Sequence, residues 1–175
     1  MQKTLFFIII FLMSQTIRAQ ENESFHLYSL GYETGFYKAE SANNWGAESN
    51  LIAAFKHHKN IFEGVVSFGV IGDFGQEDDN ILEEITEFFT ARFITVSALY
   101  GRDIPLSERL FFTGLAGPSY IYAADGDESD VGAHLKIRFN YLIRDRVTLG
   151  VSNNALLSSI DTKLSFNFFM NFRLK

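Results

Sequence analysis

The chain of 175 residues contains no cysteine and only two prolines. Without cysteine no disulfide can form, so an exported protein of this sequence needs another source of stability. The same absence excludes attachment of a lipid to an N-terminal cysteine. Beyond residues 5–13 the sequence has no apolar run approaching the ~20 residues of a transmembrane helix. A disulfide scaffold and a lipoprotein are therefore excluded.

Basic residues are also scarce. The sequence has 15 Lys and Arg against 21 Asp and Glu, a formal net charge of −6. Because nucleic-acid backbones require a basic surface, this balance argues against a nucleic-acid partner. The acids gather in residues 73–87 and 125–130. The second run lacks the sixth-position glycine and the distal glutamate of a calcium loop, so we interpret it as a solvated acidic loop.

Residues 1–19 have the three parts of a secretory signal peptide. Lys3 provides the positive start, residues 5–13 form the apolar core, and Ala19 is the small residue before the expected cleavage site. Cleavage there leaves residues 20–175 as one domain. This domain has 13 basic and 21 acidic residues, a formal net charge of −8. The alternative is an N-terminal membrane anchor, for which the apolar core is too short.

The remaining chain consists of stretches in which apolar and polar residues alternate, as in half-buried strands. In the last stretch only Phe169 breaks the alternation. Each stretch is long enough for a tilted transmembrane strand of ~9–11 residues. The predicted strands are Phe25–Tyr37, Trp45–His57, Ile61–Gly72, Phe88–Tyr100, Leu110–Ala123, Val131–Ile143, Val147–Leu157 and Lys163–Lys175.

Connections between these strands alternate in length. Residues 57–60 and 144–146 are short and polar, and residues 102–109 contain a turn-forming proline. The others are generally longer and more acidic: 38–44, 73–87, 124–130 and 158–162. Residues 81–88 could form a short helix or extend the fourth strand. Short turns at one end and long loops at the other predict an all-β, eight-stranded antiparallel up-and-down transmembrane β-barrel, with both termini on the periplasmic side.

Side-chain volume predicts which face of each strand points inward. The interior of an eight-stranded barrel is just wide enough for side chains to fill it. One face carries bulky apolar groups, including Phe36, Leu51, Phe68, Phe139 and Phe166. The other carries small ones, including Ser29, Gly31, Gly35, Gly69 and Ser152. We therefore expect the apolar face to contact lipid and the small, polar face to line the lumen.

Aromatic residues cluster near the predicted strand ends, which is typical of the two interfacial girdles of outer-membrane barrels. The expected outer girdle includes Phe36, Tyr37, Trp45, Tyr120 and Tyr122, and the inner one includes Phe25, Tyr28, Phe62, Tyr100 and Phe111. The alternative is that aromatics favour any strand.

Ionisable residues on the inward face must pair, because isolated charges are costly to bury. We expect Glu33 and Glu48 to form a network with Lys136 and Arg138 that plugs the lumen. Lys56, Glu63 and His134 share that face. Two alternatives are a gated ion path and a catalytic carboxylate pair.

No cofactor or metal site is predicted. The sequence has no phosphate loop, dinucleotide fingerprint or zinc pattern. The adjacent His57 and His58 fit a solvated turn better than a metal site.

The stretch Gly114–Tyr120, with the pattern Gly-x-x-Gly-Pro-Ser-Tyr, is similar to one in the small outer-membrane β-barrels of Gram-negative bacteria, the OmpX/OmpA-barrel-like group. The final strand resembles the signal read by the barrel-assembly machinery, with polar Asn167 before Phe172 and Leu174, although Phe169 replaces the usual glycine. The resemblance implies an outer-membrane location and contact with lipid and lipopolysaccharide. It also implies a monomer with a structural or surface-interaction role.

Three other hypotheses remain open at this stage. Ser152-Asn153 resembles part of the His-x-Ser-Asn stretch of outer-membrane lipid A deacylases, but Gly150 replaces the histidine. A serine hydrolase needs a nearby base, and His134 on the neighbouring strand is the candidate. The second is a soluble periplasmic barrel with an apolar ligand, and the third is a narrow pore.

Overall fold

The computed structural model describes residues 25–40, 45–71, 93–123, 128–159 and 161–174. In this part of the chain, no helix has the length and apolar character needed to cross a membrane. The predicted signal peptide, the acidic run 73–87 and the candidate helix 81–88 lie outside the described residues.

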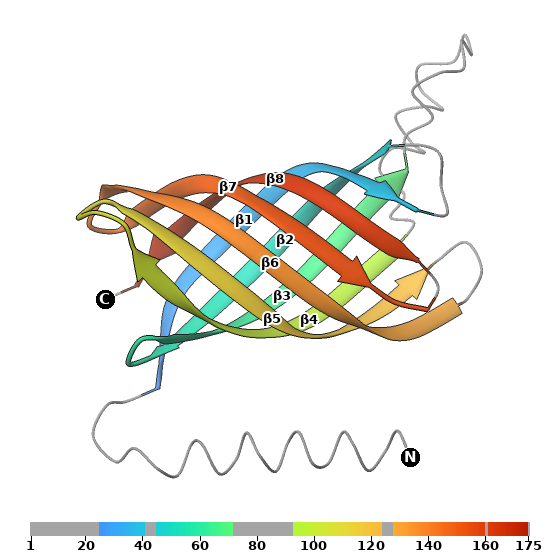
Figure 1. Ribbon diagram of the computed structural model, residues 1–175, viewed down its shortest axis with the longest axis horizontal. Coiled ribbons are helices and arrows are strands. Elements are labelled where there is room, and N and C mark those ends of the chain that lie inside the picture. The colour runs from blue at the N-terminus through green and yellow to red at the C-terminus, as the bar shows by residue number, and fades with distance from the viewer. Residues whose placement is uncertain (1–24, 41–44, 72–92, 124–127, 160, 175) are drawn as a thin grey trace, which may run out of the picture.

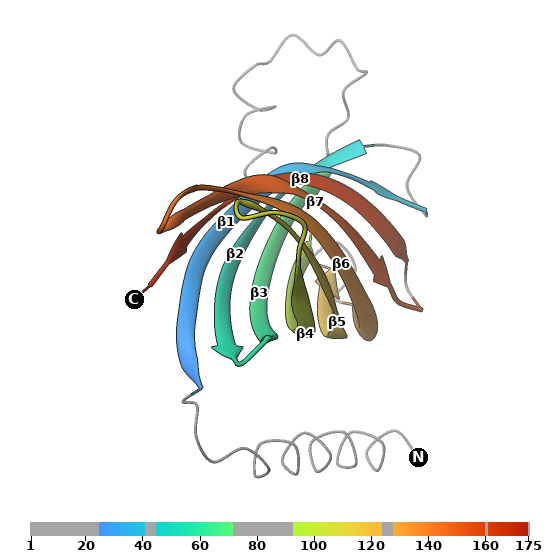
Figure 2. The ribbon, with the colours of Figure 1, turned by 60° about the vertical axis from the view of Figure 1, so that its left-hand side comes forward.

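Eight strands form a closed barrel (Figures 1 and 2). Each strand pairs antiparallel with the next, and β8 pairs with β1, so that no edge strand is left. The predicted fold class is confirmed. The strands are β1 (His26–Ala39), β2 (Trp45–His57), β3 (Asn60–Ile71), β4 (Phe93–Pro105), β5 (Leu110–Ala123), β6 (Glu128–Arg144), β7 (Val147–Leu157) and β8 (Thr162–Arg173).

The two ends of the barrel differ. The tight β2–β3, β4–β5 and β6–β7 connections lie at one end together with the C-terminal end of β8, and we name this the turn end (Figure 1). The β1–β2, β3–β4, β5–β6 and β7–β8 connections lie at the opposite end, named the loop end.

Within the described residues, two predicted boundaries differ from the observed ones by three or more residues, and the predicted start of the fourth strand at Phe88 lies outside them. β4 continues to Pro105, because residues 102–105 pair with residues 111–114 of β5. The sequence predicts Arg102 and Asp103 in the proline-containing connection 102–109, but both residues belong to the ladder. β6 begins at Glu128, because residues 128–130 pair with residues 121–123, so part of the expected acidic loop is strand.

Pro118 does not produce a bulge. Ser119 pairs with Ser97 and Ala116 pairs with Tyr100, so the β4–β5 register is the same on both sides of it. Only the pairs of Gly117 and Pro118 with β4 are missing, as expected for a residue without an N–H donor. The β4–β5 ladder is therefore interrupted at these two residues without a shift of register.

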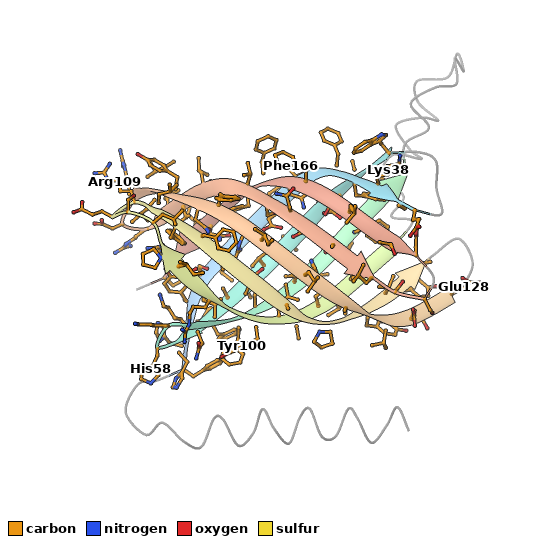
Figure 3. All side chains as sticks on the ribbon, in the orientation of Figure 1. Lys38, His58, Tyr100, Arg109, Glu128 and Phe166 are labelled. Carbon is orange, nitrogen blue, oxygen red and sulfur yellow. The ribbon has the colours of Figure 1, made fainter. Side chains whose placement is uncertain are left out.

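The predicted orientation of the two faces is confirmed. Apolar side chains point outward, and Phe168, Phe36 and Leu51 are 59%, 55% and 55% exposed. Ser67 and Ser29 are buried in the lumen. Figure 3 shows the labelled Phe166 directed away from the barrel. A soluble ligand-binding barrel would have the opposite arrangement, so that hypothesis is not supported.

The aromatic residues at the turn end form a row across β1 to β4. The Phe25 ring stacks on Phe55 with centroids 5.1 Å apart and meets Phe62 edge-on at 5.6 Å, and Phe62 lies 5.0 Å from Tyr100. Exposed aromatics at the loop end include Phe36, Trp45, Tyr120 and Tyr122. Both ends of the outer surface therefore carry aromatic residues at interfacial positions.

Three predicted girdle residues point elsewhere. Tyr37 is only 2% exposed and lies in the lumen. Tyr28 and Phe111 line a cavity inside the turn end, where their ring centroids lie 5.4 and 5.1 Å from the Arg173 guanidinium. Tyr28 turns inward because the β1–β2 register shifts at this residue.

Inward aromatic rings are accommodated over glycines on neighbouring strands. The Phe93 ring occupies the space above its partner Gly69, and the Tyr37 ring does the same above Gly46. At each glycine a Cβ atom would collide with the ring carbons. The small residues that predicted the inner face are thus the ones that make room for large interior rings.

Replacing Gly69 by alanine is expected to destabilise the barrel by about 1–3 kcal/mol, because the new methyl group overpacks the Phe93 ring. The measurement is urea unfolding of the barrel in lipid vesicles. The double variant with Phe93→Leu should recover part of the loss, because the three atoms nearest to the added carbon all belong to that ring. Additive effects of the two substitutions would contradict this packing.

Candidate functional site in the barrel lumen

A cluster of four ionisable residues crosses the centre of the lumen. Lys136 Nζ lies 2.9 Å from both Glu33 Oε1 and Glu63 Oε1. Arg138 Nη2 donates to Glu63 Oε2 at 2.5 Å, and Arg138 Nη1 lies 3.9 Å from Glu33 Oε1. The side chains are 0–3% exposed. We name these four residues the central cluster.

The strand order explains why the central cluster closes the barrel. Glu33 lies on β1 and Glu63 on β3, whereas Lys136 and Arg138 lie on β6. Since β6 is not adjacent to β1 or β3, these contacts bridge the lumen instead of running along one wall. Charges removed from water must pair in this way, because breaking a buried pair leaves a charge without compensation.

Phe169 explains the one break in the alternation of β8. Its ring is buried in the lumen, with the centroid 5.4 Å from the Arg138 guanidinium carbon. Gly150, its partner on β7, has no side chain and leaves space for the ring. A cation over an aromatic face gains ~0.5–2 kcal/mol. Phe169 therefore supports the central cluster.

Glu48 was expected to join the central cluster, but it lies in a separate group. It lies 2.6 Å from Lys163 Nζ and accepts a hydrogen bond from Asn167 Nδ2 at 2.7 Å. Asn50 Nδ2 lies between the two groups, 3.4 Å from Glu33 Oε2 and 3.5 Å from Glu48 Oε1. The structure thus brings together three of the four predicted network residues and places the fourth in a second group.

The sequence interpretation also missed Lys163. Its alternation with Ser165 and Asn167 on β8 already placed it on the inward face. Lys163 Nζ lies 3.9 Å from the Phe93 ring centroid and 5.1 Å from that of Tyr37. The two groups together contain three carboxylates and three cations, so their formal charges cancel.

His134 has a partner other than the predicted one. Its Nδ1 lies 2.9 Å from Ser97 Oγ, which is 2.5 Å from Ser119 Oγ. Ser152 is paired instead with Arg138 and Asn167 in the sheet. The Ser152 hydroxyl is fully buried and has no hydrogen-bond partner among the described residues. The dyad that a deacylase-like enzyme would need is not formed.

The cavities between the lumen side chains are small. One, at the turn end, has a volume of about 20 Å³, and one beside Glu48 and His134 has about 10 Å³. Each has room for about one water molecule, far below the ~300 Å³ or more of a small-molecule site. No group of three or more potential metal ligands occurs within the described parts of the chain. Between the described lumen side chains, these two cavities have room for water and not for a small-molecule ligand.

Comparison with known proteins identifies the fold. No protein-family model matches the sequence, and no curated protein matches it. Among solved structures, Neisserial surface protein A is 10% identical, covering 87% of this chain and all of its own, with a TM-score of 0.58. Ail, the attachment invasion locus protein of Yersinia pestis, solved with the heparin analogue sucrose octasulfate, is 10% identical over 85% of this chain and 97% of its own, with a TM-score of 0.50. The predicted resemblance to small outer-membrane barrels is confirmed at the level of the fold.

Proposed function

We propose that this chain is an outer-membrane β-barrel protein of a Gram-negative bacterium, with a structural or surface-interaction role and no catalytic activity. Residues 1–19 direct its export, and residues 20–175 form the monomeric barrel. The observation that supports this most is the orientation of its faces. Bulky apolar groups cover the outside while paired charges fill the inside, and only a lipid environment makes that arrangement favourable.

Because side chains fill the lumen, the outer surface of the barrel is the part available to other molecules. The central cluster bridges the barrel at mid-height, and the described cavities hold about one water molecule each. The lipid-facing belt and the two ends of the barrel then make the contacts with other molecules. Its partners in this proposal are outer-membrane lipid, lipopolysaccharide and, during insertion, the barrel-assembly machinery.

Cell fractionation tests the location. In a Gram-negative host, we expect the chain in the outer-membrane fraction, released only by detergent. Protease added to intact cells should cleave at the loop end, within residues 72–92, and leave the turn end intact. Recovery of the chain in the soluble periplasmic fraction would overturn the proposal.

A shortened variant separates a surface-contact role from a scaffold role. Replacing residues 72–92 by an Asn-Gly turn joins β3 directly to β4. We expect this barrel still to reach the outer membrane, and cells displaying it to adhere less to a test surface than cells with the full chain. Equal adhesion of cells with the shortened and the full chain would show that residues 72–92 do not contribute to surface contact.

Ser152→Ala is expected to leave the acylation of lipid A unchanged, because the Ser152 hydroxyl contacts no base in the described lumen. The measurement is mass spectrometry of lipid A from cells expressing either form, with cells lacking the protein as the control. Loss of an acyl chain that depends on Ser152 would show that the barrel is an enzyme.

A further inference from the structure

Exposed basic residues gather at the turn end of the barrel. We name this set the basic rim: Lys59, Arg102, Arg109, Arg144 and Arg146. No member of the basic rim forms a salt bridge within the described residues. Only two exposed acids, Glu108 and Asp145, share these turns, so the rim and these acids together carry a formal charge of +3. Figure 3 shows Arg109 at this end.

Among the described residues, the one further acid at this end does not neutralise the rim. Asp103 accepts a hydrogen bond from Thr113 at 2.6 Å and lies 4.0 Å from Lys56 Nζ. Asp103 and Thr113 both line the turn-end cavity inside the barrel. The Asp103 carboxylate therefore interacts with groups inside the barrel, and it does not offset the positive charge of the basic rim.

The basic rim directly follows the apolar belt. Arg144 is three residues beyond the lipid-facing Tyr141 on β6, which is about 10 Å along a strand. Arg102 follows the exposed Tyr100 on β4, and Arg109 precedes the exposed Leu110 on β5. Tyrosine in a barrel girdle sits at headgroup level. With these tyrosines at headgroup level, the guanidinium groups lie on the water side of the apolar belt, where their long side chains can reach lipid phosphates.

The loop end has the opposite character. Its exposed described charges are Lys38, Glu40 and Glu128. In the sequence, the segment 72–92 that leaves from this end carries seven acids and one base. The barrel is thus electrically polar along its axis, with its basic end at the turns.

We propose that the basic rim binds the phosphate headgroups of anionic phospholipids in the leaflet at the turn end. The inference rests on the proposed membrane location. Guanidinium groups donate charge-assisted hydrogen bonds to phosphate oxygens, frequently in pairs. The headgroup of an anionic lipid leaves its phosphate charge uncompensated, whereas the amine of a zwitterionic lipid offsets it. Each basic side chain near an anionic surface strengthens binding by about fivefold.

The single tryptophan of the chain makes a two-ended test feasible. Trp45 faces outward at the loop end. The double variant Trp45→Phe, Tyr141→Trp moves the reporter to the turn end, beside Arg109 and Arg144. Both forms are reconstituted in phosphatidylcholine vesicles containing brominated phosphatidylglycerol or, in parallel, brominated phosphatidylcholine. Quenching of tryptophan fluorescence then measures the relative affinity of each lipid for each end.

We expect brominated phosphatidylglycerol to bind at least about threefold more strongly than brominated phosphatidylcholine at the turn-end reporter, and no such preference at Trp45. The ratio of phosphatidylglycerol to phosphatidylcholine binding should fall to about one in 1 M salt, because salt screens the charges. This comparison uses the chain without any charge substitution. The preference should also disappear in the triple variant Arg109→Gln, Arg144→Gln, Arg146→Gln. The control double variant Glu108→Gln, Asp145→Asn should retain or increase the preference.

Equal quenching by the two lipids at the turn-end reporter in low salt would overturn the lipid-binding inference and leave the membrane location intact. A preference that survives both 1 M salt and the triple substitution would overturn it as well, because the basic rim would not be its cause. Absence of quenching by either lipid at both reporters would instead contradict the proposed membrane location itself.

Discussion

Replacing Glu63 by glutamine is expected to lower the free energy of unfolding by about 3–5 kcal/mol. The substitution removes the carboxylate that both Lys136 and Arg138 contact, at 2.9 and 2.5 Å. Glu33 would remain as the one carboxylate of the central cluster, 2.9 Å from Lys136 and 3.9 Å from Arg138. Two buried cations would then share one acid. The measurement is equilibrium urea unfolding in lipid vesicles.

Glu108→Gln is the matched control for this substitution. Glu108 is exposed in the β4–β5 turn, so its replacement should change stability by no more than about 0.5 kcal/mol. Adding Lys136→Met to Glu63→Gln restores the balance of charge in the central cluster and should recover part of the loss. Equal and small effects of Glu63→Gln and Glu108→Gln would show that the central cluster does not stabilise the barrel.

The second large effect concerns the outer face. Ile137→Arg places a charge halfway along the lipid-facing side of β6 and should cost about 2–4 kcal/mol. Ile143→Arg makes the same change near the turn end of the same strand, where the cost should be about 0–1 kcal/mol. Vesicle unfolding of both variants gives the comparison. A similar cost at both positions would indicate that depth in a bilayer does not control the energy.

Strand periodicity predicted much of this barrel, because side chains alternate strictly between faces. The inward positions of Glu33, Lys136 and Arg138 followed from the parity of their strands. Periodicity does not fix which inward groups meet across the lumen, since that depends on the register of all eight strands. For this reason Glu48 was assigned to the wrong partners and Lys163 was missed.

Local composition was a weaker guide than periodicity. Tyr37 was placed in the outer girdle because it is an aromatic residue near a strand end, yet the missing side chain of Gly46 admits its ring to the lumen. The proline of residues 102–109 predicts a turn that includes Arg102 and Asp103, yet Asp103 is a strand residue whose carboxylate accepts a hydrogen bond from Thr113. In both cases a partner on the neighbouring strand decided the outcome, and a single strand does not reveal that partner.

The most direct test of the account uses the absence of cysteine, since any single introduced cysteine is unique. Phe139→Cys lies on the outer face and Ser119→Cys in the buried lumen. With the barrel in vesicles, a lipid-dissolved maleimide should label Phe139→Cys and leave Ser119→Cys unlabelled until denaturant unfolds the chain. Labelling of Ser119→Cys in the folded barrel, with Phe139→Cys protected, would contradict a barrel whose apolar face contacts lipid.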